Sequence, residues 1–159
     1  MSKQTWQNDG SAVSDVIEMV GRAEKWVVTL IDGLDKHVDE ETRSRILEQC
    51  GRQCQSQSFI RKARAIYKKS HDVPDFLEKL GRVYKHLHLE GDRVYVVYPR
   101  CYCSRVNKIH KGKVSATYCK CSLGWSKALF EGALERPVEV KMEKSIINGD
   151  KECKFRIIL

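Results

Sequence analysis

Two pairs of cysteines with the same spacing are the residues of this chain best suited to chemistry. Cys101 and Cys103 are separated by one residue, and so are Cys119 and Cys121. Residues two apart on a β-strand point to the same face of a sheet. Four thiolates at about 2.3 Å from one ion form a closed tetrahedral zinc site. The spacing therefore predicts a metal site, provided that the two pairs lie on neighbouring strands.

A short polar segment between the two pairs indicates how they would meet. Residues 110–112, His-Lys-Gly, suit a three-residue hairpin loop with glycine in the left-handed conformation. That loop places Cys101 opposite Cys121 and Cys103 opposite Cys119, with all four sulfurs on one face. We therefore predict a Zn²⁺ site at these four cysteines, and an iron–sulfur cluster would use the same ligands. Unligated structural or redox thiols and a catalytic thiol are the alternatives.

Other cysteines widen the set of candidate ligands. Cys50 and Cys54 share a helix face at i, i+4 spacing, which suits either two metal ligands or a stripe of core residues. Cys121 precedes a predicted helix, whose N-terminus would lower the pKa of the thiol. A nucleophile needs a nearby base, and His86 and His88 could approach only through the tertiary fold.

Composition sets the class of protein. The 159 residues predict a single domain, and 42% hydrophobic with 31% charged residues indicates a globular chain. No apolar run approaches the roughly 20 residues that span a bilayer, and the first residues lack an apolar signal core. We expect a cytoplasmic protein, in which seven cysteines stay reduced. The net charge of +8 is interleaved with acidic residues, which disfavours nucleic acid as a partner. A homodimer remains open.

Hydrophobic periodicity predicts an α+β fold, with N-terminal helices packed on a mainly antiparallel sheet of about four strands and one inserted helix. Residues 1–10 are expected to be disordered, residues 11–90 to be helical and residues 91–159 to form the sheet part. The predicted helices cover residues 13–34, a segment from Asp39, residues 58–69, a segment from Asp72 to about Leu87, and a short helix capped by Ser122. The predicted strands cover residues 94–98, 114–121, 138–146 and 152–159.

The last two strands reveal their register. Asn148-Gly149 is a strong signal for a two-residue turn. This turn places Val140 opposite Ile157, so that apolar residues face one another across the hairpin. The same register places Cys153 on the core face, opposite Lys144, where a small buried hydrophobic residue is expected.

The C-terminal quarter, from Cys119 to Leu159, carries a family resemblance. Its elements are Gly124-Trp125, Arg136-Pro137-Val138-Glu139-Val140, Glu143, Gly149-Asp150 and Cys153-Lys154-Phe155. This pattern resembles the vinyl-reductase-type small-molecule-binding domains, whose fold is akin to that of TRAPP vesicle-tethering subunits. The resemblance implies a ligand-binding sensor or accessory module. It also implies a zinc set of Cys119 or Cys121, Glu143 and Cys153, with Ile146 where the family has its remaining cysteine.

We therefore expect a non-enzymatic, cysteine-rich domain that binds zinc and binds or senses a small ligand between its helices and its sheet. Tyr95, Tyr98 and Tyr102 lie near the cysteines, where they either line a small pocket or pack within the sheet. The alternative is a thiol- or metal-dependent hydrolase. A weaker likeness to small bacterial proteins grouped with aminothiazoline-carboxylate hydrolases implies that activity.

Overall fold

Helices form the first half of the chain and most of the sheet follows. The computed structural model describes residues 21–107 and 113–159. The expectations for residues 1–10, 13–20 and 110–112 therefore lie outside the described residues. The α-helices are α2 (Arg22–His37), α3 (Glu40–Cys54), α4 (Gln57–Tyr67), α5 (Val73–Val83) and α6 (Lys120–Leu134). The strands are β1 (Leu87–Glu90), β2 (Arg93–Tyr98), β3 (Glu139–Lys144) and β4 (Cys153–Ile158), and η1 (Ala116–Cys119) and η2 (Ile146–Asn148) are short 3-10 helices.

Aspartate side chains cap the N-termini of α3 and α5, two helices that the sequence predicts. Asp39 accepts a hydrogen bond from the Thr42 amide at the start of α3, and Asp72 accepts one from the Asp75 amide at the start of α5. Each such cap satisfies an amide that the helix itself cannot pair. The predicted helices from Asp39 and from Asp72 are thus confirmed, although α5 ends at Val83, earlier than expected.

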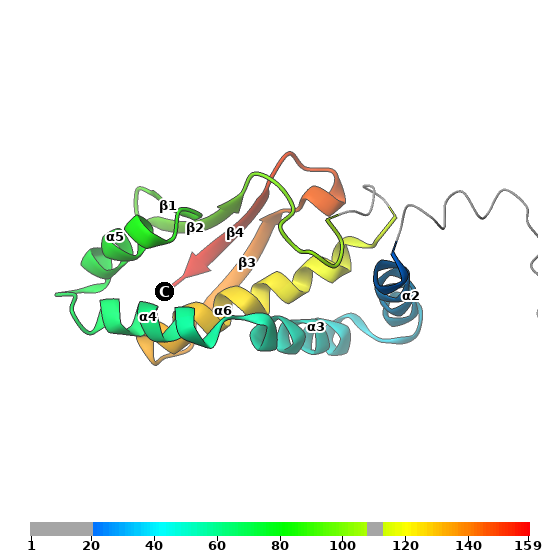
Figure 1. The fold of residues 1–159 in the computed structure, drawn as a ribbon, viewed down its shortest axis with the longest axis horizontal. Coiled ribbons are helices and arrows are strands. Elements are labelled where there is room, and N and C mark those ends of the chain that lie inside the picture. The colour runs from blue at the N-terminus through cyan, green and yellow to red at the C-terminus, as the bar shows by residue number, and fades with distance from the viewer. Residues whose placement is uncertain (1–20, 108–112) are drawn as a thin grey trace, which may run out of the picture.

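The sheet is antiparallel throughout, with the strand order β1-β2-β4-β3. In the sequence, helix α6 is inserted between β2 and β3. In space it lies between the sheet and the helices α3 and α4 (Figure 1). The main core lies between this sheet and the helices α4, α5 and α6, and it includes Phe76, Phe130 and Phe155. The predicted α+β class with one inserted helix is confirmed.

The predicted cysteine hairpin is wrong. No described residue in 99–107 or 113–121 forms a strand, and the segment before α6 is the 3-10 helix η1. The Ser115 side chain accepts a hydrogen bond from the Thr117 amide, which turns the chain into η1. This local capping overrides the strand propensity of Val114 and Tyr118. Helix α6 accordingly begins at Lys120, with Cys119 rather than Ser122 at its cap position.

The fourth strand of the sheet is β1, which the sequence pattern did not predict, whereas the predicted strand at residues 114–121 is absent. β1 pairs with β2 through a tight turn at Gly91, whose φ of 62° is in the left-handed region that favours glycine. Only Leu87 of β1 is buried, so the alternation that indicates a half-buried strand is absent there. For this reason the segment reads as the end of the preceding helix.

The predicted register of the last hairpin is confirmed over most of its length. Val140 lies opposite Ile157, as expected. A bulge between Met142 and Lys144 then shifts the pairing, so that Lys144 faces Lys154 instead of Cys153. The connection is also longer than a two-residue turn, because η2 precedes Gly149.

The helices α3 and α6 approach each other closely where they cross at two glycines. A Cβ atom on Gly51 would collide with the carbonyl oxygen of Cys121, and one on Gly124 would collide with that of Glu48. Two ion pairs flank the crossing, Arg52 with Glu131 and Lys127 with Glu48, each at 2.6 Å. The two backbones are therefore in direct contact, which brings the C-terminal half of α3 against the first turns of α6.

We predict that Gly51→Ala lowers the free energy of unfolding by at least about 1–3 kcal/mol, because backbone atoms cannot move aside as a flexible side chain can. The matched control is Gly81→Ala in α5, where a Cβ atom meets nothing within 4 Å. This control is expected to leave stability unchanged or to raise it by about 0.4–1 kcal/mol. Urea unfolding followed by circular dichroism measures both variants, and equal stabilities would contradict the crossing.

Candidate functional site

All seven cysteines of the chain line one cavity of about 740 Å³. Its walls come from α2, α3, the start of α6, the segment after β2 and the ends of β2 and β4. The lining is mostly apolar, and aromatic side chains are prominent in it. The aromatic lining residues are Trp26, Phe59, Tyr84, His86, Tyr98, Tyr102, Tyr118, Trp125 and Phe155. The cavity is therefore the natural candidate for a functional site.

The cysteines reach the cavity from four directions. The helix α3 supplies Cys50 and Cys54, and the irregular segment after β2 supplies Cys101 and Cys103. Cys119 ends η1, Cys121 lies in the first turn of α6, and Cys153 begins β4. The four cysteines of the predicted zinc site thus share one cavity, but a loop and a helix start hold them instead of a hairpin.

Each thiol with a resolved polar contact has a partner of its own. Cys103 Sγ and the Tyr118 hydroxyl lie 3.0 Å apart, and the Ser145 hydroxyl donates to Cys119 Sγ at 3.2 Å. The Ile146 amide donates to Cys153 Sγ at 3.4 Å, and the Arg105 guanidinium donates to Cys54 Sγ at 3.7 Å. In residues 21–107 and 113–159, no three His, Cys, Asp or Glu side chains are placed to hold a metal ion. The described geometry does not support the predicted zinc site.

Burial dominates the chemistry of the inner thiols. Desolvation raises the pKa of Cys119 to about 12, against which the hydrogen bond from Ser145 acts. Desolvation also raises the pKa of Cys121 to about 12, and the neighbouring Cys103 and Cys119 add to the shift. The pKa values of Cys101 and Cys153 are raised by burial as well. The expected lowering of the Cys121 pKa by the helix N-terminus is therefore outweighed, and the buried thiols are protonated at neutral pH.

A cluster of aromatic side chains lines part of the cavity. The hydroxyls of Tyr84 and Tyr98 lie 2.6 Å apart, and each satisfies the other away from water. Desolvation raises the pKa of Tyr98 to about 12. The His86 ring packs 4.7 Å from that of Tyr98 and 5.2 Å from that of Tyr102, measured between centroids. Tyr98 and Tyr102 thus line the cavity, whereas Tyr95 lies under the ammonium group of Lys154.

Three lining residues, two of α2 and one after α5, could not be identified as such from the sequence. Trp26 and Leu30 of α2 line the cavity although both are exposed, with 66% and 43% of their surfaces accessible. His86 reaches the cavity because the chain leaves α5 at Val83 and turns into β1. The amphipathic pattern of the first helix indicated a buried face, but it carried no signal for a cavity.

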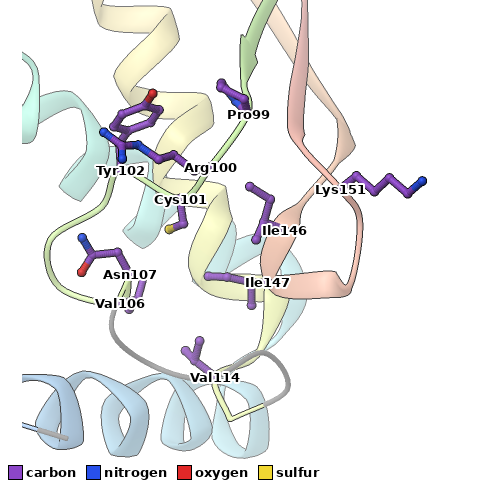
Figure 2. Close-up of a pocket in the computed structure, with 10 residues that line it drawn as sticks. All are labelled: Pro99, Arg100, Cys101, Tyr102, Val106, Asn107, Val114, Ile146, Ile147 and Lys151. Atoms are coloured by element: carbon purple, nitrogen blue, oxygen red, sulfur yellow. The ribbon is translucent and has the colours of Figure 1, made fainter.

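A second pocket of about 690 Å³ adjoins the cavity. Both are lined by Arg100, Cys101, Tyr102, Val106 and Ile147, so the two spaces meet along the segment after β2. Figure 2 shows the Cys101 side chain pointing between that segment and the side chains of Ile146 and Ile147. We call this space the outer pocket, because exposed residues such as Pro99, Asn107 and Lys151 line it.

The arrangement of helices and sheet defines a TRAPP-like fold. The chain is similar to a crystal structure of a trafficking protein particle complex subunit 3 from Naegleria fowleri covalently bound to palmitic acid. The TM-score is 0.54 and the sequence identity 16%, and the match covers 86% of this chain and 92% of that one. The TRAPP-like part of the predicted resemblance is confirmed, while the narrower likenesses to vinyl-reductase-type domains and to hydrolases stay predictions.

Residues 12–159 match the model of the family of unknown function DUF6144, and the chain belongs to that family. A comparison with curated proteins gives no match. Among the described residues, no helix has the length and apolar character that crossing a membrane requires.

We predict that brief iodoacetamide treatment at pH 7 modifies the exposed Cys50 and Cys54 and leaves Cys119 and Cys121 unmodified. The thiolate is the reactive form, and its fraction falls about tenfold for each pH unit below the pKa. Raising the pH toward 12 should therefore increase modification of the inner pair. Peptide mass spectrometry measures the extent at each cysteine, and rapid labelling of Cys121 at neutral pH would show an activated thiol instead.

Proposed function

We propose that this chain is a non-enzymatic binding domain that holds a small apolar ligand in its cysteine-lined cavity. The observation that carries the proposal is the cavity itself, because about 740 Å³ lined by apolar and aromatic side chains is typical of a ligand site. Two of its polar groups, the hydroxyls of Tyr84 and Tyr98, are hydrogen-bonded to each other. A ligand that offers mainly hydrocarbon surface therefore suits the cavity best.

The structural comparison supports a particular ligand class. The Naegleria TRAPP subunit with this fold is covalently bound to palmitic acid. A fatty-acyl chain is accordingly the first ligand to test here. The thiols that line the cavity supply nucleophilic atoms that could carry such a chain covalently, although their raised pKa values favour non-covalent binding at neutral pH.

The state of the thiols also favours binding over hydrolysis. A cysteine hydrolase needs a thiolate and a base within hydrogen-bond reach. Cys119 and Cys121 are protonated at neutral pH, and among the described residues no histidine nitrogen makes a resolved hydrogen bond with a cysteine sulfur. The thiol- or metal-dependent hydrolase is therefore the weaker proposal.

The ligand proposal predicts that purified protein binds hexadecanoate and that Trp26→Ala weakens this binding about three- to tenfold through lost apolar contact. Trp26 is 66% exposed, so its truncation should leave the fold intact. The control is Leu89→Ala, since Leu89 is 49% exposed on β1 and lies outside the cavity lining. Displacement of a fluorescent fatty-acid probe measures the affinities, and thermal unfolding checks both variants. Absence of binding to the unaltered protein would contradict the proposed function.

Metal binding stays a prediction, favoured by the gathering of seven cysteines around one cavity. Zinc at Cys101, Cys103, Cys119 and Cys121 would require these thiols to deprotonate and move together. Elemental analysis of protein purified without added metal is expected to give one zinc per chain if the site forms. The double variant Cys101→Ser, Cys103→Ser should then lose that zinc, whereas Cys50→Ser should keep it. Metal well below one equivalent, with all seven thiols freely titratable in unfolded protein, would exclude the site.

A further inference from the structure

Positive charge is concentrated in one segment of the chain. Residues 93–130 contain eight lysine and arginine residues and no aspartate or glutamate. The remaining 21 lysine and arginine residues are balanced in number by the 21 acidic residues of the chain. The net charge of +8 thus arises in this segment, and its described residues Arg100 and Arg105 line the cavity.

Several cations of this segment are already engaged. Lys120 pairs with Glu40 at 2.9 Å, and Lys127 pairs with Glu48 at 2.6 Å. The guanidinium of Arg105 lies against Cys54 Sγ. Arg100 differs, because its only resolved partner is the ring of Tyr102, 4.8 Å below it, and within the described residues no carboxylate pairs with it.

Arg100 also occupies a particular place between the two spaces. It lines both the apolar cavity and the outer pocket, next to Cys101, where they meet. Figure 2 shows its side chain extending along Tyr102, while Lys151, on the other side of the pocket, points away. Asn107 lines the outer pocket too and offers an amide. A ligand whose tail fills the cavity could therefore place its other end beside a guanidinium.

We infer that the ligand is an anionic amphiphile, with its hydrocarbon chain in the cavity and its carboxylate or phosphate group held by Arg100 at the boundary with the outer pocket. This inference rests on the proposed function and deepens it. A guanidinium presents paired N–H donors that match a planar carboxylate or a phosphate, and a charged acceptor strengthens each hydrogen bond. Stacking on Tyr102 holds the guanidinium ready for that contact.

The test compares ligands that share one chain and differ at its end: dodecanoate, dodecyl phosphate and dodecan-1-ol. Unaltered protein is expected to bind at least one of the two anions about tenfold more tightly than the alcohol at low salt, and the preference should shrink as salt rises. The stronger of the two anions identifies the head group. Equal affinities for all three would overturn the inference and leave the proposed function standing, whereas binding of none would contradict the proposed function itself.

Variants then assign the preference to one residue. Arg100→Gln should lower the affinity for the preferred anion about tenfold and lower the affinity for dodecan-1-ol much less, so that the anion preference is lost. Arg100→Lys should keep part of the preference because it keeps the charge. Lys151→Gln is the matched control, since it removes a cation of the same pocket that points away from the centre. An anion preference that survives Arg100→Gln, or falls equally in both neutral variants, would overturn the role of Arg100.

Discussion

The close crossing of α3 and α6 at Gly51 and Gly124 is the constraint on which the shape of the cavity depends. Because neither residue carries a Cβ atom, α3 and α6 meet backbone to backbone. Their side chains must therefore pass on either side of the crossing. Cys50 and Cys54 on α3 consequently lie around the same space as Cys121 and Trp125 on α6. The cavity is the volume that two touching helices, the helix α2 and the segment after β2 leave between them.

The setting of the thiols distinguishes a lined cavity from a reactive centre. A helix start is a feature that usually activates a cysteine. Here desolvation of Cys119 and Cys121 by burial exceeds that effect and keeps both thiols neutral. Neutral thiols behave as small hydrophobic groups, so the cysteines contribute to an apolar surface. The same composition that suggests metal chemistry in the sequence thus serves a hydrocarbon-binding surface in the proposed function.

Local signals in the sequence predicted local structure well, and tertiary contacts limited the rest. The caps at Asp39 and Asp72 and the Val140–Ile157 register follow from neighbouring residues, and each was correctly predicted. The cysteine hairpin failed because both of its arms turn instead of extending. The Thr117 amide donates to the Ser115 side chain in a 3-10 turn, and the amides of Val106 and Asn107 donate to the Cys103 carbonyl.

The cavity could not be predicted from local sequence patterns, because its lining comes from segments far apart in the chain. Cys50 and Cys153 reach the same space as Cys101 only because a glycine crossing and a strand pairing, far apart in the chain, act together. From sequence alone, a glycine within a helix indicates only lower helix stability. That it allows close approach of another helix can be seen only when the partner helix is known.

The burial of the thiols has a consequence for the behaviour of the protein in alkaline solution. In the unfolded chain, Cys119 and Cys121 would lose their protons near pH 9, whereas in the folded chain they keep them until about pH 12. The unfolded state therefore binds fewer protons between these values, and the free energy of unfolding decreases as the pH rises through this window. Below pH 9 both states carry the protons and the thiols impose no such loss. The burial of these thiols in an apolar lining thus also sets an alkaline limit on the fold.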